Sequence, residues 1–446
     1  MRRSTALLVA TAATAAVVTG VAPATAEPAH NGEKIARAEL APGGAGRLGR
    51  PFGAKEAGST GQEAEAEPFD GTRFIPTAPR RVLDTRSGLG RDGVTAPVGA
   101  GGRIEVRVGD VPQYTESVVL NVTGTSPTAA TYVTVWEGGG ITRPGVSTLN
   151  LVPGETRANS VTTWVSPDST VNLYNNAGST HLIADVAGYY VRDNPGVGST
   201  PAKFFATGPA RVYDSRSTSR GAFYAGESRG IDFTSASVPS GATAVSLNIT
   251  GVDATESTYV TAWPSGSDRP TASSLNVVPG GATPNGVTVA LGADRKVNLY
   301  NNAGFLNLVV DITGYYLPTE SGGADFYAVT PTRSFDTREY GESIWPSETL
   351  TLLFMHPDVV PGNSLLMNLT GTEPTAHTYI TAYPAGYSRP NTSALNLVPG
   401  QTSPNMAAVR FGSAYDYDAG VYRPAHSYYN NAGYTHLVVD VFGIFA

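Results

Sequence analysis

Apolar and polar residues alternate with a period of two along most of the chain beyond residue 72. Clear runs of this kind are found at 117–124, 131–136, 147–152, 159–165, 170–176 and 181–190. The runs are rich in Val, Thr, Ile and Tyr, which favour strands, and Gly, Pro and Asn separate them. The NNAG tetrad at 175–178 predicts a hairpin turn, in which Asn and Gly take left-handed backbone angles.

The spacing of these runs predicts an all-β fold, because no window of twelve residues has the period of a helix. About eight strands in about 115 residues are typical of an antiparallel β-sandwich of the jelly-roll or Ig-like kind. A small closed barrel is the alternative.

Three copies of one motif set fill the chain from residue 73 to its end. The segment RRVLDTR at 80–86 returns as ARVYDSR at 210–216 and as TRSFDTR at 332–338. YNNAG recurs at 174–178, 300–304 and 429–433, and the copies end in DVAGYY, DITGYY and DVFGIF. A unit of this length is a domain and not a short solenoid repeat. We therefore predict three β-sandwich domains, at 73–194 (repeat 1), 195–318 (repeat 2) and 324–446 (repeat 3).

The N-terminal region has the pattern of an export signal. Arg2 and Arg3 precede an apolar run at 6–21, and a small-x-small cleavage site follows at 24–26. The run is too short and too rich in Ala and Thr for a membrane anchor. Residues 1–26 are thus a predicted signal peptide, and we expect a secreted, extracellular protein that associates with the cell wall non-covalently, if at all.

Residues 27–72 contain mainly Ala, Gly, Glu and Pro with almost no aromatic residues. Such a composition cannot bury enough apolar surface to offset the entropy of ordering, so we predict a disordered linker here. A pro-segment is the alternative.

Charge and composition exclude several classes of function. The formal net charge is −7, whereas a nucleic-acid partner requires a dense basic face. The chain has no Cys and six His, and no His recurs in all three copies, since Asn307 stands where the other copies have His181 and His436. Motifs of serine hydrolases, zinc proteases and phosphate loops are lacking. We therefore expect no enzyme activity, no catalytic residues, no cofactor and no metal, no nucleic acid partner and no membrane span.

An Arg-x-x-Asp-x-Arg element and a later acid in the final strand recur in every copy. On a regular strand Asp84 and Arg86 would share one face and Arg81 would lie on the other. An acid within so apolar a strand as 181–190 needs a charged partner, and a repeated arginine is the obvious one. We interpret the set as structural ion pairs, with a bidentate anion clamp as the alternative. Its members are Arg81, Asp84, Arg86, Asp185, Arg211, Asp214, Arg216, Asp311, Arg333, Asp336, Arg338 and Asp440.

An aromatic stripe on the strand TYVTVW is the candidate ligand site. Alternation places Tyr132, Thr134 and Trp136 on one face and two valines on the other. Sugar rings could stack on such a stripe, with a nearby arginine as its polar edge. Alternatively these rings fill the sandwich core. The candidate ligand-binding residues are Tyr132, Trp136, Arg143, Tyr259, Trp263, Arg269, Tyr379, Tyr383 and Arg389.

Two Leu-Asn pairs, or Met-Asn in one case, also recur in each copy. Asn side chains can satisfy backbone groups at strand ends and bulges, and we favour this structural role over binding of sugar hydroxyls. The Asn-x-Thr triplets among them formally match a glycosylation acceptor. These residues are Asn121, Asn248, Asn368, Asn150, Asn276 and Asn396.

The motif set RVLDTR, LN(V/I)TG, P-x-x-SxLN, YNxxG and D(V/I)xGYY resembles a repeat module of secreted actinobacterial proteins. The resemblance covers nearly everything from residue 72 to 446. It implies a non-catalytic, envelope-associated accessory module of the type attached to exported amidases and esterases. This chain departs from that arrangement because no catalytic domain is attached.

Two hypotheses of function follow from the sequence. The first is a multivalent, non-catalytic binding protein of the bacterial cell envelope, whose partner is a cell-wall or surface glycan or an envelope protein. Three linked copies of a weak site would supply avidity. The second is a structural or assembly protein whose repeats mediate protein–protein packing, with no small ligand. Exposure of the aromatic stripe distinguishes them.

Overall fold

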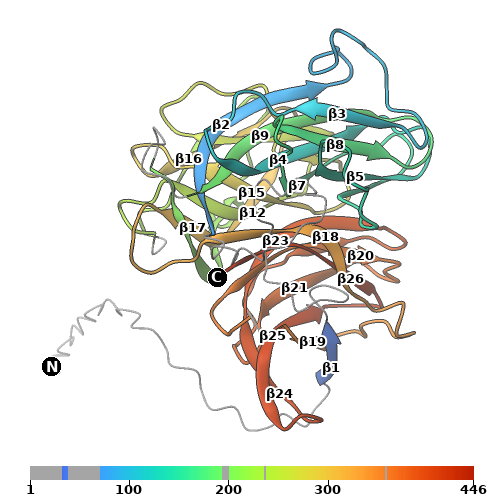
Figure 1. The fold of residues 1–446 in the computed structure, drawn as a ribbon, viewed down its shortest axis with the longest axis vertical. Helices are drawn as coiled ribbons and strands as arrows, with labels where there is room; N and C mark the ends of the chain where they lie inside the picture. The colour runs from blue at the N-terminus through green and yellow to red at the C-terminus, as the bar shows by residue number, and fades with distance from the viewer. Residues whose placement is uncertain (1–32, 39–70, 193–199, 236–237, 357–358) are drawn as a thin grey trace, which may run out of the picture.

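The computed structural model describes residues 33–38, 71–192, 200–235, 238–356 and 359–446. The described part is almost entirely β-structure, with one short 3-10 turn at Ser215–Ser217. Strands and sheets confirm the predicted all-β class and a sandwich architecture (Figure 1). The predicted signal peptide, 1–26, lies outside the described residues.

Each repeat contributes four antiparallel strands that face the other repeats, here called its inner sheet, and the inner sheets of repeats 1 and 3 join edge to edge as one eight-stranded sheet. In repeat 1 the order is Thr72–Asp84 (β2), His181–Arg192 (β9), Thr115–Thr125 (β4) and Thr156–Trp164 (β7). Repeat 2 has Lys203–Asp214 (β10), Asn307–Leu317 (β17), Ala244–Val252 (β12) and Thr283–Ala290 (β15). Repeat 3 has Phe326–Asp336 (β18), His436–Phe445 (β26), Ser364–Thr372 (β20) and Ser403–Arg410 (β23). The strand order is the same in all three.

A second, outer sheet completes each sandwich, again with one strand order. In repeat 1 it comprises Arg103–Arg107 (β3), Thr170–Asn175 (β8), Thr131–Glu137 (β5) and Leu149–Leu151 (β6). Repeat 2 has Ser228–Asp232 (β11), Lys296–Asn301 (β16), Thr258–Pro264 (β13) and Leu275–Val277 (β14). Repeat 3 has Thr349–Phe354 (β19), Val421–Asn430 (β25), Thr378–Pro384 (β21) and Leu395–Leu397 (β22).

Repeat 3 carries two additional strands. Gly412–Asp416 (β24) pairs with β25, and Glu33–Ala38 (β1) pairs in parallel with the edge strand β19. Figure 1 shows β1 beside β19 and β24, far along the chain from them. The prediction of a disordered linker throughout 27–72 is therefore wrong for 33–38, where backbone pairing to β19 orders the chain. Residue 72 begins β2, and residues 39–70 lie outside the described part.

The NNAG turn does not form the predicted hairpin. It joins β8 of the outer sheet to β9 of the inner sheet, and these strands do not pair with each other. The first Asn of the tetrad, Asn175, is fully buried and donates to the carbonyls of Val98 (2.9 Å) and Gly178 (3.1 Å). Gly178 adopts φ +56°, as the turn prediction required. The tetrad thus connects the two layers of the sandwich.

Apolar side chains between the two sheets form the core of each sandwich. In repeat 2, for example, Leu247 on β12 packs with Val260 on β13 and Leu299 on β16. All three are at most 2% exposed. This packing accounts for the two-residue alternation, because one face of every strand points into the core.

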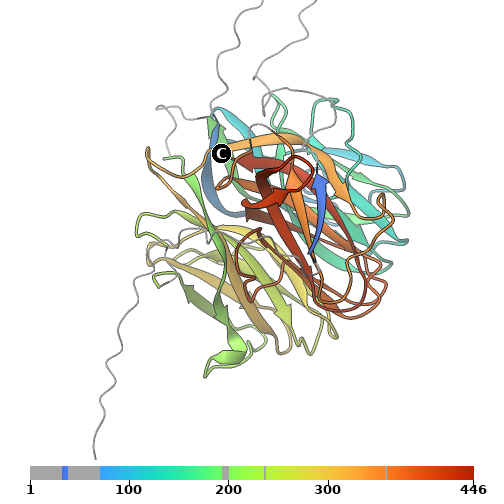
Figure 2. The ribbon, with the colours of Figure 1, turned by 90° about the horizontal axis from the view of Figure 1, so that it is seen from below.

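Six aromatic rings form a closed ring of contacts where the three inner sheets meet. Pairs within a repeat alternate with pairs between repeats, at centroid distances of 4.1–5.2 Å. The order around the ring is Phe74, Tyr316, Phe204, Phe445, Phe326 and Tyr190. All six are at most 2% exposed. Figure 2 shows the three repeats packed around one another, and these rings share one hydrophobic cluster.

Buried asparagine pairs join neighbouring repeats. Asn159 of repeat 1 donates to Asn368 Oδ1 of repeat 3 (2.9 Å), and Asn368 donates to the carbonyl of Ser147 (2.9 Å). The other two junctions repeat this arrangement, with pairs Asn285–Asn121 and Asn405–Asn248, each at 2.9 Å. Asn121, Asn248 and Asn368 therefore satisfy polar groups at the junctions. Asn150 and Asn396 instead accept hydrogen bonds from Ser147 (3.1 Å) and Ser393 (3.0 Å) of their own repeat. Asn121, Asn248 and Asn368 are not accessible as glycosylation sites in this fold, since their amides are committed to the neighbouring repeat.

Candidate functional site

The aromatic stripe does not present its large rings to solvent. Val133 and Val135 point into the core, as alternation requires, so Trp136 lies on the opposite face of β5. The segment that follows β5 folds back over this face. Trp136 donates from Nε1 to the carbonyl of Ile141 (2.8 Å), and Thr134 donates to that of Val146 (2.8 Å).

Trp136 is consequently only 3% exposed, and Trp263 and Tyr383 are 4% and 7% exposed. These three residues are not a stacking platform for a ligand, which corrects the prediction. They are not core residues either, because the covering segment of the same repeat buries them from outside. Sequence alternation identified the face of the strand, but it carried no signal for the segment that covers it.

Half-buried tyrosines and exposed arginines from the predicted ligand set form one cluster in each repeat. Tyr132 lies beside Tyr174 of YNNAG (centroids 6.2 Å apart), and the Arg143 guanidinium sits over the Tyr174 ring at 4.0 Å. Arg143 also donates to the Tyr132 hydroxyl (3.2 Å). The equivalent clusters are Tyr259–Tyr300–Arg269 and Tyr379–Tyr429–Arg389. Each arginine holds down the start of the covering segment and occupies one ring face.

The repeated Arg and Asp residues form one chain of ion pairs in each repeat. Arg81 donates from Nε and Nη2 to Asp185 (2.9 and 3.2 Å), and Arg86 makes a second bidentate pair with Asp84 (2.9 and 2.7 Å). Arg81 Nη1 also donates to Asp84 (3.2 Å). The equivalent chains are Arg216–Asp214–Arg211–Asp311 and Arg338–Asp336–Arg333–Asp440.

Arg81 reaches both acids because the strand is irregular. The pairing register of β2 with β9 shifts between Arg81 and Leu83, so regular alternation fails at this point. The expectation that Arg81 lies on the face opposite to Asp84 is therefore wrong. Arg81 Nη2 also donates to the carbonyl of Thr271 in repeat 2 (3.1 Å), which places the ion pairs at the edge of a junction between repeats.

The two acids of each chain differ in protonation behaviour. Burial raises the pKa of Asp185, although the bonds from Arg81 oppose it. In repeat 2, burial likewise raises the pKa of Asp311, whereas bonds from Arg216 lower the pKa of Asp214. Desolvation of the buried final-strand acid therefore outweighs the hydrogen bonds from its arginine. That these pairs serve stability and not binding stays a prediction.

Two pairs of exposed aromatic rings, missed by the sequence argument, lie at equivalent loops of repeats 2 and 3. Tyr224 and Phe305 are 56% and 50% exposed and meet edge to face, with centroids 5.2 Å apart. Trp345 and Tyr434 are 58% and 45% exposed and meet in the same way at 5.7 Å. Each second ring directly follows YNNAG in the sequence. That adjacency was the available signal.

Buried polar groups fix these loops in place. The buried Asn301 of YNNAG donates to the carbonyl of Tyr224 (3.2 Å), and Asn430 donates to that of Trp345 (3.1 Å). In both repeats the backbone N–H of the first ring residue donates to a carboxylate: Tyr224 donates to Glu227 (2.9 Å), and Trp345 donates to Glu348 (2.7 Å).

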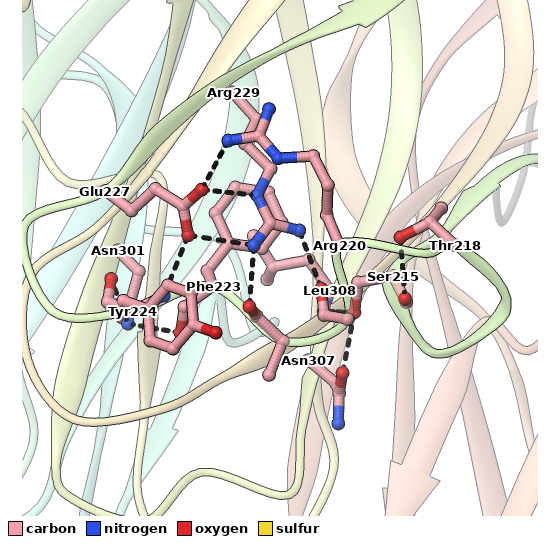
Figure 3. Close-up of polar contacts among 12 residues, drawn as sticks. Ser215, Thr218, Arg220, Phe223, Tyr224, Glu227, Arg229, Asn301, Asn307 and Leu308 are labelled. Atoms are coloured by element: carbon pink, nitrogen blue, oxygen red, sulfur yellow. Dashed lines mark hydrogen bonds and ion pairs between the residues drawn. The ribbon is translucent and has the colours of Figure 1, made fainter.

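Figure 3 shows how Glu227 is itself held. Arg229, 5% exposed, donates to both carboxylate oxygens (2.8 Å each), and its guanidinium lies over the Phe223 ring at 4.1 Å. Arg220 donates to Glu227 as well (2.7 Å). The bond from Arg229 is the largest influence that lowers the pKa of Glu227, to about 2. The ionised Glu227, itself held by two arginines, therefore fixes the backbone of the loop that carries the exposed Tyr224 ring.

The described residues of repeat 1 contain no such pair of exposed aromatic rings at the equivalent loop. Its backbone follows the same path, since Asn175 donates to the carbonyl of Gly99 as Asn301 does to Tyr224. Gly99 and Ser179 thus stand where repeat 2 has Tyr224 and Phe305. The loop forms without the rings, so the fold does not require them.

Comparisons with known proteins give little further information. No family model matches the chain, and the curated proteins contain no match. Two solved structures align over 84% of the chain and 91–92% of their own, at 9–10% identity. Their titles describe a triple jelly-roll fold and turret assembly in an archaeal virus, and Sulfolobus Turreted Icosahedral Virus. Their TM-score is 0.17, too low to support any argument about fold or function.

Within the part of the chain that the structure describes, no helix has the length and apolar character needed to cross a bilayer.

Proposed function

We propose that this protein is a secreted, non-catalytic binding protein of the bacterial cell envelope, which holds glycans at the exposed aromatic pairs of repeats 2 and 3. The proposal treats the chain as three tandem β-sandwich domains that follow a signal peptide. It places the protein with the actinobacterial envelope modules that its motifs resemble. Binding is assigned to two sites per chain and not to the three that the motif repeats alone suggested.

The exposed rings are the observation that carries this proposal. Leaving Trp345 and Tyr224 more than half exposed forgoes the free energy of burying a large apolar surface. Repeat 1 folds the same loop with Gly99 in this position, so the rings contribute nothing that the loop needs. Side chains that the fold does not require, held rigidly in solvent, are suited to a ligand.

The geometry of the pairs suits the flat apolar face of a sugar ring. Two rings that meet edge to face leave one ring face open, while the second ring limits how a ligand can lie. Arg220 and Asn302 lie on the neighbouring segments of repeat 2 and offer donors for hydroxyl groups. Each site is small, so useful affinity for a polymer depends on the link between the two sites.

Binding to purified cell walls and to a glycan array tests the proposal. We expect Tyr224→Ala and Trp345→Ala each to weaken retention on cell walls about tenfold, and the double variant to abolish it. The melting temperature should change by less than about 2 °C, because both rings are exposed. Tyr387→Ala, which removes an exposed ring of repeat 3 (43%) outside the two aromatic pairs, is the matched control. Retention of the double variant at the level of wild type would contradict the proposal.

The alternative function is a structural protein whose repeats pack against partner proteins, and less surface is available for such packing than the sequence suggested. The inner-sheet faces that such packing would use are already covered by the other repeats of the same chain, through the aromatic ring and the Asn pairs. An assembly role therefore requires a surface outside these junctions.

A further inference from the structure

The edge of the repeat 3 outer sheet is occupied by the N-terminal strand. Six residues of β1 run parallel to β19 in unbroken register, from the pair Glu33–Thr349 to the pair Ala38–Phe354. Ile35 packs with Leu353 in a small cluster of its own, and Ala38 is fully buried. The structure therefore defines a site that accepts a strand, with a known sequence and direction.

The same edge differs between the repeats. In repeat 1 the edge strand β3 reads RIEVR, and three exposed charged residues on it oppose the addition of another strand. In repeat 3 the edge strand β19 reads TLTLLF, and its last five residues are buried. An uncharged apolar edge of this kind needs a cover. Among the described residues, β1 supplies it.

Repeat 3 also provides charges that match the strand. Arg37 of β1 donates to Asp416 (2.6 Å) and Asp418 (2.7 Å), and Lys34 pairs with Glu342. The two aspartates lie at and just after the end of β24, an additional strand that repeats 1 and 2 do not have in their described residues. Hydrogen bonds from Arg37 and then from Arg423 lower the pKa of Asp416 to about 2. The acceptor is thus built for a cationic strand.

The strand contacts repeat 3 through the β19 edge, the ion pairs of Arg37 and Lys34, and the buried Ala38. A cleft of about 590 Å³ separates β1 from the neighbouring surface and is lined by Arg37, Tyr340, Glu342 and Asp418. Residues 39–71 connect β1 to β2, and a connection of this length can extend to about 110 Å. The chain can therefore bring β1 to the acceptor of another molecule as well as to its own.

We infer that the β19 edge is a strand-acceptor site that takes β1 of a second copy of this chain. The contacts would be the same six-residue register and the same Arg37–Asp416–Asp418 cluster, now formed between molecules. Each copy carries one donor strand and one acceptor edge, so two copies can exchange strands reciprocally as a closed dimer, and more copies can link head to tail. Such oligomers multiply the number of ligand sites, but the inference does not depend on what those sites bind.

Refolding at different concentrations tests this inference. The mature protein is refolded from denaturant between about 1 μM and 500 μM and analysed by size-exclusion chromatography with light scattering. We expect wild type to form dimers and longer oligomers in increasing amounts with concentration. The full-length variant Ile35→Asp/Arg37→Asp should remain monomeric. Arg107→Asp, the same charge change at an exposed arginine on the edge strand of repeat 1, should behave as wild type.

A synthetic peptide of residues 30–41 provides a second measurement that needs no folded variant. Excess peptide should dissolve the wild-type oligomers, and an Arg37→Asp peptide should be at least tenfold less effective. Wild type that stays monomeric over the whole range would overturn the inference. Oligomers that persist in Ile35→Asp/Arg37→Asp, or that resist the peptide, would overturn it as well.

Discussion

Removing the side chain of Asn159 should destabilise the whole chain. This residue is fully buried and makes three hydrogen bonds: to the carbonyl of Thr148 (2.7 Å), to Asn368 Oδ1 (2.9 Å) and from the backbone N–H of Met406 (3.0 Å). Two of these bonds cross from repeat 1 to repeat 3. Asn159→Ala therefore breaks a junction without changing a charge.

The magnitude follows from the groups left behind. Each buried polar group that loses its partner costs about 1–3 kcal/mol, so three such groups predict a loss of about 3–5 kcal/mol after some relaxation. The equivalent Asn285 offers a control within the same fold, because its Oδ1 has no hydrogen-bond partner among the described residues. Asn285→Ala should cost about 1–2 kcal/mol less than Asn159→Ala.

Urea unfolding, followed by tryptophan fluorescence and by circular dichroism, measures both costs. We expect a single transition in wild type, since the aromatic ring and the Asn pairs join all three repeats into one cooperative unit. Asn176→Ala, at an exposed position, should change the unfolding free energy by less than about 0.5 kcal/mol. A cost below about 1 kcal/mol for Asn159→Ala, or three separate transitions in wild type, would refute this reasoning.

Three other predictions follow from the same geometry. Asp185→Asn should destabilise the protein by about 3 kcal/mol in urea and leave cell-wall retention of the remaining folded protein unchanged, because Arg81 loses a bidentate partner inside the fold; lost binding at unchanged stability would instead make it a ligand residue. Burial lowers the pKa of His426 to about 3 in the folded state, below the unfolded value near 6.5. The stability of the folded state should therefore be complete above about pH 6.5 and decline towards pH 3, with a loss of about 2 kcal/mol at pH 5. Urea unfolding of wild type and of His426→Phe across this pH range tests the prediction. The unfolding free energy of wild type should fall with pH, and that of the variant should lose this dependence. Gly99→Tyr/Ser179→Phe should install an aromatic pair in repeat 1 and tighten cell-wall retention severalfold, since a Cβ at Gly99 meets open space; equal or weaker retention at unchanged stability would count against the aromatic pairs as ligand sites.

Local pattern was sufficient to predict much of the fold. Two-residue alternation identified the strands, and the number of about eight per copy holds for β2–β9 and for β10–β17. Ion-pair partners were also predictable, because an acid as buried as Asp185 in an apolar strand requires a cation and the repeat supplied one in Arg81. In these cases the physical requirement lies within one strand or its direct neighbour.

Predictions failed where a segment from another part of the chain decides the environment. Alternation correctly placed Trp136 on the face opposite to Val135, yet whether that face meets water depends on the backbone that returns as far as Ile141. Composition correctly described 27–72 as almost free of aromatic residues, but six of these residues are ordered by an edge strand more than 300 residues later. Composition reports how much apolar surface a segment can bury by itself, and it does not report hydrogen bonding of its backbone to a distant strand edge.

Differences between the repeats proved more informative about function than their shared motifs. Residues common to all three copies, such as Asn175 of YNNAG and Arg81, bond to backbone or to buried acids and thereby maintain the fold. Features confined to one or two copies, such as the ring of Trp345 and the Asp416 hairpin, are dispensable for a fold that the remaining copies achieve without them. Because three copies share one architecture, each serves as a control for the others, and the side chains that break the repeat are where ligand and partner specificity are best sought.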